Sequence, residues 1–122
     1  MSTILIVEDD PVLVKMYAKK FEKDGFKVET AVDGQEALDK VVAVAPNVIL
    51  LDVMLPKVDG FEVLKQIKEK PEIKDVPVVL STNLGGGDAD KEKGTKMGAV
   101  DYLVKSDFTP AQIVQKVKGY IK

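Results

Sequence analysis

Three residue types with strong side-chain chemistry are missing from this chain of 122 residues: cysteine, histidine and arginine. Without cysteine the chain can form no disulfide, no thiolate metal site and no thiol nucleophile. Without histidine, no imidazole can act as a base, a zinc ligand or a phosphate carrier. All 18 basic residues are lysines. An anion can therefore be bound only by ammonium groups, backbone N–H groups, hydroxyls or a metal ion, because the bidentate fork of arginine is absent.

Long apolar runs and a strong net charge are also missing. No apolar stretch approaches the roughly 20 residues that a membrane-spanning helix needs, and the N-terminus lacks the basic region and cleavage pattern of a signal peptide. The formal net charge of -2 gives no general attraction to nucleic acid or to an anionic membrane. We therefore expect a cytoplasmic domain over residues 1–122 that binds neither nucleic acid nor membrane directly.

Short aliphatic runs alternate with amphipathic stretches along the chain. Ile4 to Val7 and Val48 to Leu51 are continuous apolar runs, which are typical of strands buried on both faces of a parallel sheet. Asp10-Pro11 is a typical helix start, and Asp24-Gly25 a typical helix end. The pattern predicts an α/β fold of five βα units, a doubly wound parallel sheet. The predicted strands cover residues 4–7, 26–30, 48–51, 76–80 and 102–104, and the predicted helices begin near residues 11, 34, 60, 88 and 110.

Four of the five predicted strands end in polar groups that can carry chemistry. In an open parallel sheet, ligands bind outside the carboxyl ends of the strands, so these groups are expected at one edge. Several carboxylates at one spot repel each other unless a cation joins them, and hard oxygen ligands favour a divalent metal such as Mg²⁺. The groups concerned are Glu8-Asp9-Asp10, Asp52, Ser81-Thr82 and Lys105.

The whole chain resembles the receiver domain of two-component response regulators, a family with the flavodoxin-like (βα)5 fold. The resemblance is specific through the combination of motifs, although each is weak alone. The matching segments are ILIVEDDP at 4–11, VILLDVMLPKVDGFEVL at 48–64, PVVLST at 77–82 and DYLVK at 101–105.

This resemblance implies a role for each residue at the strand edge. Asp52 would accept a phosphoryl group from a sensor histidine kinase or a phosphotransfer protein. Mg²⁺ would be held directly by Asp9 and Asp52, through water by Glu8, and by the backbone carbonyl of Met54. The chain would be a signalling domain and not an enzyme, although it would assist its own phosphorylation and dephosphorylation. It would act on a downstream protein target as a monomer or weak dimer, with Lys105 as the active-site lysine, Ser81 as the switch hydroxyl and Tyr102 as the switch aromatic.

The sequence departs from the family pattern at several positions near the expected site. Ser106 follows Lys105 where the family usually has proline, and Thr82 stands where the family often has alanine or glycine. Met54 and Asn83 occupy variable positions that are thought to tune the lifetime of the phosphate. Three consecutive glycines, residues 85–87, predict either a loose loop tip after the fourth strand or a mobile segment that becomes ordered when Ser81 captures the phosphate.

Other readings of these residues are open. A Mg²⁺-dependent aspartyl-phosphate hydrolase of the haloacid dehalogenase type would need a second Asp where Met54 stands. A flavodoxin would need a hydroxyl- and glycine-rich loop after the first strand, where this chain has carboxylates that repel phosphate. A degenerate receiver would bind partners without being phosphorylated. More simply, Asp10 would be a helix cap, and Tyr102 a half-buried strand aromatic.

Overall fold

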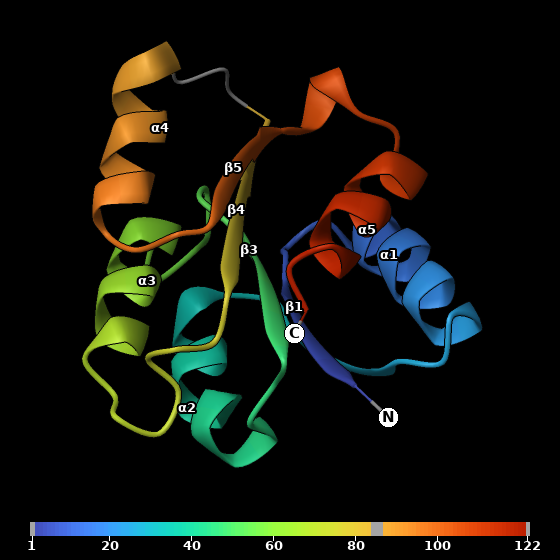
Figure 1. Ribbon diagram of the computed structural model, residues 1–122, viewed down its shortest axis with the longest axis horizontal. Coiled ribbons are helices and arrows are strands. Elements are labelled where there is room, and N and C mark those ends of the chain that lie inside the picture. The colour runs from blue at the N-terminus through green and yellow to red at the C-terminus, as the bar shows by residue number, and fades with distance from the viewer. Residues whose placement is uncertain (1, 84–86, 122) are drawn as a thin grey trace.

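The computed structural model describes residues 2–83 and 87–121, which form one parallel sheet with helices packed on both of its faces (Figure 1). The strand order is β2-β1-β3-β4-β5. The chain adds β2 on one side of β1 and the later strands on the other side, so the order of addition switches between β1 and β3. This arrangement confirms the predicted doubly wound α/β fold. The strands are β1 (Thr3–Val7), β2 (Lys27–Ala31), β3 (Val48–Asp52), β4 (Val78–Thr82) and β5 (Asp101–Val104).

Five α-helices connect or follow the strands in the described residues. The predicted cap of the first helix is confirmed, because the Asp10 side chain accepts hydrogen bonds from the backbone N–H groups of Val12 and Leu13. The last helix has a capping box in which Thr109 and Gln112 bond reciprocally. The helices are α1 (Pro11–Lys23), α2 (Gly34–Val44), α3 (Gly60–Lys68), α4 (Gly87–Lys96) and α5 (Pro110–Lys118), and a 3-10 turn spans Lys105–Asp107.

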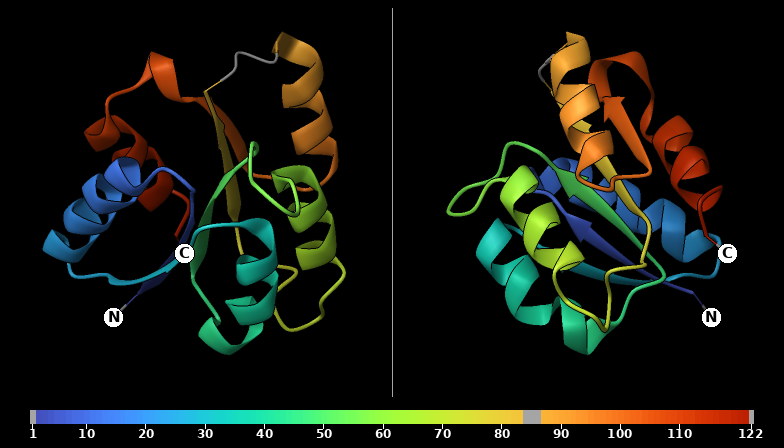
Figure 2. Two further views of the ribbon diagram at one scale, coloured as in Figure 1. Left: turned by 180° about the vertical axis from the view of Figure 1, so that it is seen from behind. Right: turned by 60° about the vertical axis from the view of Figure 1, so that its left-hand side comes forward.

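The sheet separates two hydrophobic clusters. Figures 1 and 2 show, from three directions, the helices that cover its two faces. Because side chains alternate along a strand, each buried strand contributes to both clusters. Helices α1 and α5 cover one face, where Tyr17 and Phe21 pack with Ile113 and Val117. Helices α2 and α3 cover the other face together with α4. This double covering explains why β1 and β3 read as continuous apolar runs.

Two predicted strands are displaced in the structure. Strand β2 begins one residue later than expected, and β4 spans residues 78–82 where 76–80 was predicted. The backbone N–H of Val76 is taken by the carbonyl of Ile73 in the preceding turn, and Pro77 has no N–H to give to the ladder. As a result, Ser81 and Thr82 lie within β4 and do not follow it.

A close backbone approach fixes α3 against the end of β3. A Cβ atom added at Gly60 would lie 2.3 Å from the carbonyl oxygen of Asp52, which no side chain could tolerate. The backbone N–H of Gly60 also donates to the carbonyl of Val53 at 2.9 Å. Glycine at this position therefore holds the start of α3 directly against the strand end that carries Asp52.

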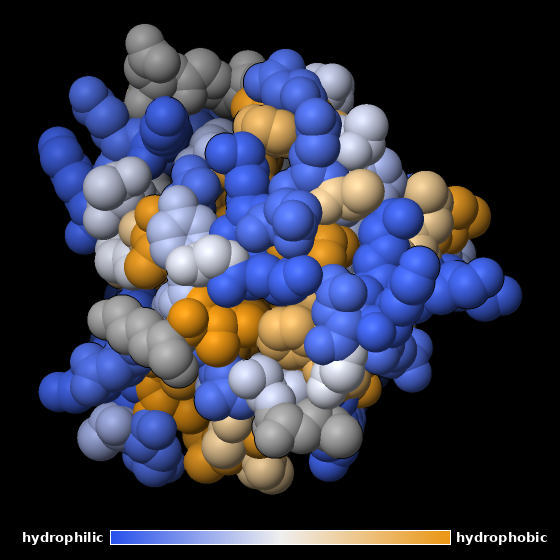
Figure 3. All heavy atoms as spheres, turned by 45° about the vertical axis from the view of Figure 1, so that its right-hand side comes forward, coloured by the Kyte–Doolittle hydropathy of each residue, from blue (hydrophilic) through white to orange (hydrophobic). Residues whose placement is uncertain are grey.

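Polar side chains cover most of the face seen in Figure 3, and apolar atoms show only in smaller areas between them. No helix among the described residues has the length and hydrophobicity to span a membrane. The predicted glycine segment lies largely outside the described residues: only Gly87 is described, as the first residue of α4.

Candidate functional site

The carboxyl ends of β1, β3, β4 and β5 bring the predicted site residues to one edge of the sheet. Strands β1 and β3 pair in register up to Val7 and Leu51, so Glu8 and Asp52 follow side by side. Asp52 is in turn the register partner of Ser81 on β4. The structure therefore places these groups at one edge of the sheet, as the sequence predicted.

A buried ion-pair network forms the centre of this edge. The Lys105 ammonium donates hydrogen bonds to Oε1 of Glu8 and, at 3.0 Å, to Oδ2 of Asp52. The three side chains are almost completely enclosed, with exposed fractions of 2% for Glu8, 3% for Asp52 and 8% for Lys105. Buried charges of this kind are stable only when paired, so each member depends on the others. We refer to Glu8, Asp52 and Lys105 as the charge cluster.

Backbone N–H groups hold the free oxygens of the two carboxylates. Oδ1 of Asp52 accepts from the N–H of Met54 at 3.0 Å, and Oε2 of Glu8 accepts from the N–H of Asp10 at 3.2 Å. Each carboxylate thus has one oxygen directed at Lys105 and the other directed at its own following loop. The arrangement orients both side chains before any ligand is present.

Burial changes the protonation of the charge cluster. Burial raises the pKa of Glu8 from 4.5 to about 7. The nearby Asp52 carboxylate raises this pKa further, and the Lys105 ammonium only partly offsets the two effects. For Lys105, burial acts to lower the pKa, but the hydrogen bonds to Glu8 and Asp52 outweigh it and leave the pKa raised. Lys105 is therefore a firmly charged ammonium, whereas Glu8 changes its charge near neutral pH.

Three carboxylates at this edge have the geometry of a metal site. One oxygen each from Glu8, Asp9 and Asp52 lie within 4.8 Å of one another, and Asp9 is exposed to solvent while the other two are buried. Hard oxygen ligands with one open, exposed side suit Mg²⁺, which retains several water ligands. These residues therefore fit the predicted ion. The Met54 carbonyl as a further ligand stays a prediction, although the Met54 N–H contact places this residue beside Asp52.

The predicted switch residues lie on β4 and β5. Ser81 is buried beside Asp52, and Tyr102 is buried on β5 opposite Leu80. Burial raises the pKa of the Tyr102 phenol, Asp90 raises it further, and a side-chain hydrogen bond with Thr82 lowers it. Thr82, which stands where the family often has alanine or glycine, thus interacts directly with the Tyr102 phenol.

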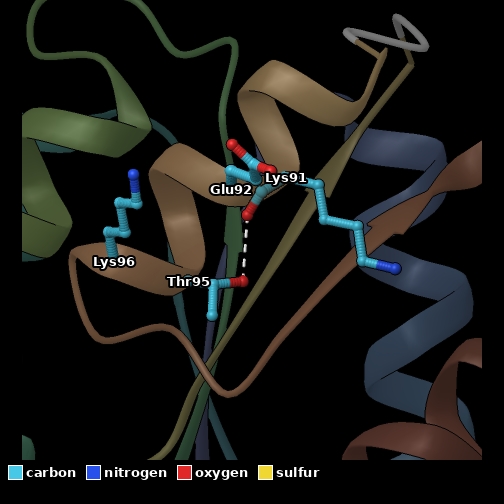
Figure 4. Close-up of a pocket in the computed structure, with 4 residues that line it drawn as sticks. All are labelled: Lys91, Glu92, Thr95 and Lys96. Atoms are coloured by element: carbon cyan, nitrogen blue, oxygen red, sulfur yellow. Dashed lines mark hydrogen bonds between the residues drawn. The ribbon is translucent and has the colours of Figure 1, made fainter.

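Helix α4 lies directly over these two strands. A Cβ atom added at Gly94 would come within 2.7 Å of Leu80 and 3.6 Å of the Tyr102 ring. The close approach of the helix backbone therefore encloses Tyr102 from outside the sheet. A hollow of about 450 Å³ on the outer side of α4, lined by Lys91, Glu92, Thr95 and Lys96, contains none of the strand-edge residues (Figure 4).

Sequence reasoning missed two features of the site. It assigned Glu8 and Lys105 to separate tasks, whereas the structure joins them directly. Helical spacing also places Tyr17 among the core residues of α1, whereas its buried hydroxyl finds no hydrogen-bond partner in the part of the chain that the structure describes. The sequence signal for Tyr17 was a hydroxyl-bearing side chain at a helix position that otherwise holds apolar residues, between Leu13 and Phe21.

The chain is similar to proteins of one family over nearly its whole length. Residues 4–118 match the family described as the response regulator receiver domain. The chain is 38% identical over 119 residues to the alkaline phosphatase synthesis transcriptional regulatory protein PhoP of Bacillus subtilis (strain 168), covering 98% of this chain and 48% of that protein. It thus spans about half the length of the curated relatives it matches.

Solved structures agree with this similarity. Chemotaxis protein CheY4 of Vibrio cholerae superposes with a TM-score of 0.90 at 30% identity, covering 99% of both chains. The Mn²⁺-bound form of response regulator Rcp1 superposes with a TM-score of 0.84 at 28% identity, covering 98% of this chain and 94% of the other.

Proposed function

This chain belongs to the response regulator receiver domain family, a phosphoacceptor signalling family of two-component systems, and we propose that Asp52 is its phosphoacceptor. The observation that carries the proposal is the hydrogen bond between Lys105 and Oδ2 of Asp52 at 3.0 Å, beside two further carboxylates. The donor would be a histidine kinase or a phosphotransfer protein, and the output would be a changed surface that regulates a downstream protein. As homologues of this kind imply, the site of action would be the cytoplasm.

Asp52 is suited to nucleophilic attack on phosphorus. Its carboxylate oxygen attacks the phosphoryl group, the P–N bond to the donor imidazole breaks, and an acyl phosphate forms as the imidazole retains the electron pair. Both reacting groups are anionic, so the attack needs compensating positive charge. The Lys105 ammonium already donates to an Asp52 oxygen and would donate to the incoming phosphoryl oxygens as they approach.

The carboxylates of Glu8, Asp9 and Asp52 would hold Mg²⁺ at the exposed side of the charge cluster. Once bound, the ion offsets the negative charge that the phosphoryl group brings. Asp9 and Asp52 would contribute direct ligands and Glu8 a ligand through water, while the Met54 carbonyl would complete the set. Their oxygens already lie within one ion's reach, which supports this assignment.

Ser81 and Tyr102 would carry the signal away from Asp52. Ser81 lies opposite Asp52, so its hydroxyl can donate to a phosphoryl oxygen on Asp52 after a change of rotamer. Any shift at Ser81 is transmitted to Thr82, whose side chain bonds to Tyr102. A charge added at Asp52 would in this way alter the packing between β5 and α4.

The alternatives are less well supported. A haloacid dehalogenase type hydrolase would need a second Asp at the position of Met54, which is apolar and 55% exposed. The degenerate receiver remains the main rival, because it shares the fold and differs only in chemistry. The assembly state is proposed to be a monomer or weak dimer.

Intact mass measurement tests the proposal. The protein is incubated with Mg²⁺ and a small phosphoramidate or acyl-phosphate donor. We expect one added phosphoryl group in the wild type and none in Asp52→Asn. Asp39→Asn is the matched control, because Asp39 is exposed on α2, where its carboxylate accepts a hydrogen bond from the Gln35 side chain. An unmodified wild type, or equal modification of Asp52→Asn, would reject Asp52 as the phosphoacceptor.

A further inference from the structure

Tyr17 carries a buried polar atom that the proposed mechanism leaves unused. Its side chain is 1% exposed, and its hydroxyl is the buried side-chain polar atom that lacks a hydrogen-bond partner in residues 2–83 and 87–121. A phenol that finds no partner in a dry interior is less favourable there than phenylalanine would be. The hydroxyl is therefore a stability defect unless another state of the protein uses it.

The ring of Tyr17 packs on the face of the sheet from which the charge cluster rises. It belongs to the same hydrophobic cluster as Ile6 and Leu50. Side chains two positions apart along a strand point to the same face, so Ile6 and Glu8 share this face, as do Leu50 and Asp52. Tyr17 thus lies beneath the buried carboxylates, on the side opposite α3.

The direction of α1 places the hydroxyl close to the cluster. Helix α1 starts directly after β1 at the reactive edge, with Asp10 as its cap. Long side chains on a helix lean toward its N-terminus, so the Tyr17 ring extends from α1 back toward that edge. Burial raises the pKa of Tyr17 to about 12, and charges on Lys105, Glu8, Asp52 and Asp10 all act on the phenol.

Lys105 is the member of the charge cluster that can donate a hydrogen bond to this hydroxyl. A lysine ammonium has three N–H donors, and Glu8 and Asp52 accept two of them. When the carboxylates bind a metal ion and a phosphoryl group, their oxygens become less available to Lys105. The ammonium then donates to the phosphoryl oxygens, and its remaining N–H needs an acceptor on the buried side, toward which the Tyr17 ring extends.

We propose that Tyr17 is a positioning residue whose hydroxyl accepts a hydrogen bond from the Lys105 ammonium in the metal-bound and phosphoryl-bound states. The phenol would keep Lys105 aimed at the phosphoryl oxygens after its bonds to Glu8 and Asp52 loosen. The inference rests on the proposed function of Asp52 and adds a residue to it. Tyr17 would touch neither the metal ion nor the phosphoryl group.

The variant Tyr17→Phe removes only the oxygen, and Tyr120→Phe is the matched control. The Tyr120 hydroxyl donates at 2.7 Å to Asp101, which begins β5 at the end of the strand opposite to Lys105. In Tyr17→Phe we expect the phosphorylation rate with a small phosphoramidate to fall about tenfold, as for the loss of one hydrogen bond to a charged group. Thermal stability without metal should be unchanged or higher, and Mg²⁺ affinity should stay within about twofold. Tyr120→Phe should keep the wild-type rate.

A purely structural Tyr17 would give the opposite pattern. A less stable Tyr17→Phe protein with a wild-type phosphorylation rate would overturn the proposal, and so would equal rate losses in both variants. A second measurement uses wild-type protein, in case the variant folds poorly. With beryllofluoride and Mg²⁺ bound, NMR should detect a slowly exchanging Tyr17 hydroxyl proton with an NOE to the Lys105 ammonium. Absence of this contact would also overturn the proposal.

The NMR contact separates this inference from the proposed function. If the wild type is not phosphorylated, Asp52 fails as the phosphoacceptor, and the Mg²⁺-loaded protein still reports whether Tyr17 meets Lys105. If the wild type is phosphorylated but the contact is missing, only the role of Tyr17 fails.

Discussion

Ser81 lies directly opposite Asp52 on the neighbouring strand, and the carbonyl of Ser81 accepts a hydrogen bond from the N–H of Val53 at 2.9 Å. The backbones of the two residues are therefore tied by the sheet, whichever way the loops beyond them move. A response at Ser81 must begin with its side chain, because its main chain is already committed to the ladder.

Ser81→Ala tests this coupling. Phosphorylation of Asp52 should continue, because the nucleophile and Lys105 are unchanged, but the signal at Tyr102 should weaken. We expect the amide shift of Tyr102 on adding beryllofluoride and Mg²⁺ to fall to less than about half of the wild-type value, as measured by ¹H–¹⁵N spectra. Since Ser81 is buried, the stability change should be of the order of 1 kcal/mol. A full Tyr102 response in Ser81→Ala would show that another group senses the phosphate.

Asp9→Asn tests the metal site. Asp9 is the exposed member of the three carboxylates, so its charge adds repulsion without belonging to the buried ion-pair network. Removing that charge should weaken Mg²⁺ binding by at least about tenfold and raise the metal-free free energy of unfolding by up to about 1 kcal/mol. Isothermal titration and urea unfolding measure the two effects. Unchanged Mg²⁺ affinity in Asp9→Asn would show that the metal ion does not bind at this edge of the sheet.

Lys105→Met should be costly in a manner that depends on pH. It leaves Glu8 and Asp52 buried without their cation, which we expect to lower stability by up to about 3 kcal/mol at pH 8. At pH 5 the loss should be smaller, because Glu8 can take up a proton. Lys105→Arg should restore stability only in part, since a planar guanidinium does not fit where a compact ammonium does, and both variants should be phosphorylated more slowly. Equal losses at both pH values would contradict this account.

Glu8 gives the metal-free protein a specific pH dependence. Its pKa is about 7 in the folded chain against an ordinary 4.5, so the folded state binds this proton more tightly than the unfolded state. Its contribution to stability is therefore complete below pH 4.5 and is lost as the pH rises to about 7. The pKa of Asp33 is lowered by the N–H of Glu36, so Asp33 acts in the opposite sense and only below its ordinary 3.8.

Unfolding curves measured from pH 4.5 to 8 check this dependence. Wild-type stability without metal should decline across the interval, and the decline should be absent in Glu8→Gln. Saturating Mg²⁺ should remove this decline in stability, because the ion binds the carboxylate form of Glu8. The Mg²⁺ affinity should accordingly rise with pH, by at most tenfold for each pH unit below the Glu8 pKa. A decline of equal size in Glu8→Gln would assign it to another group.

The alternation of strands and helices, and the edge at which the polar strand ends gather, could be predicted because they depend on local patterns. Apolar runs followed at once by Asp52 or by Glu8 define both a strand and its reactive end. The cap at Asp10 could be predicted for the same reason, since it involves only its immediate neighbours. The limits of β4 were wrong because they depend on which carbonyl the N–H of Val76 finds, and a preceding turn supplied it.

The contacts within the site could not be read from local patterns. The bond between Lys105 and Glu8 joins residues from opposite ends of the chain, and nothing near either residue specifies it. Tyr17 repeats the helical spacing of ordinary core residues, so only its three-dimensional surroundings reveal that its oxygen has no hydrogen-bond partner among the described residues. Thr82 gained its connection to Tyr102 in the same way, through pairing of β4 with β5.

The long separation between the members of the charge cluster also determines when the site can exist during folding. Lys105 stands 97 positions after Glu8 and 53 after Asp52, and it arrives with the last strand, which joins the sheet at its edge beside β4. Contacts that close such long loops form late, after the local helices and the first strand pairs. On the ribosome, both carboxylates emerge well before the lysine that neutralises them. A chain that has not yet docked β5 therefore has a partial sheet whose edge carries unpaired carboxylates, and only complete folding joins them to Lys105.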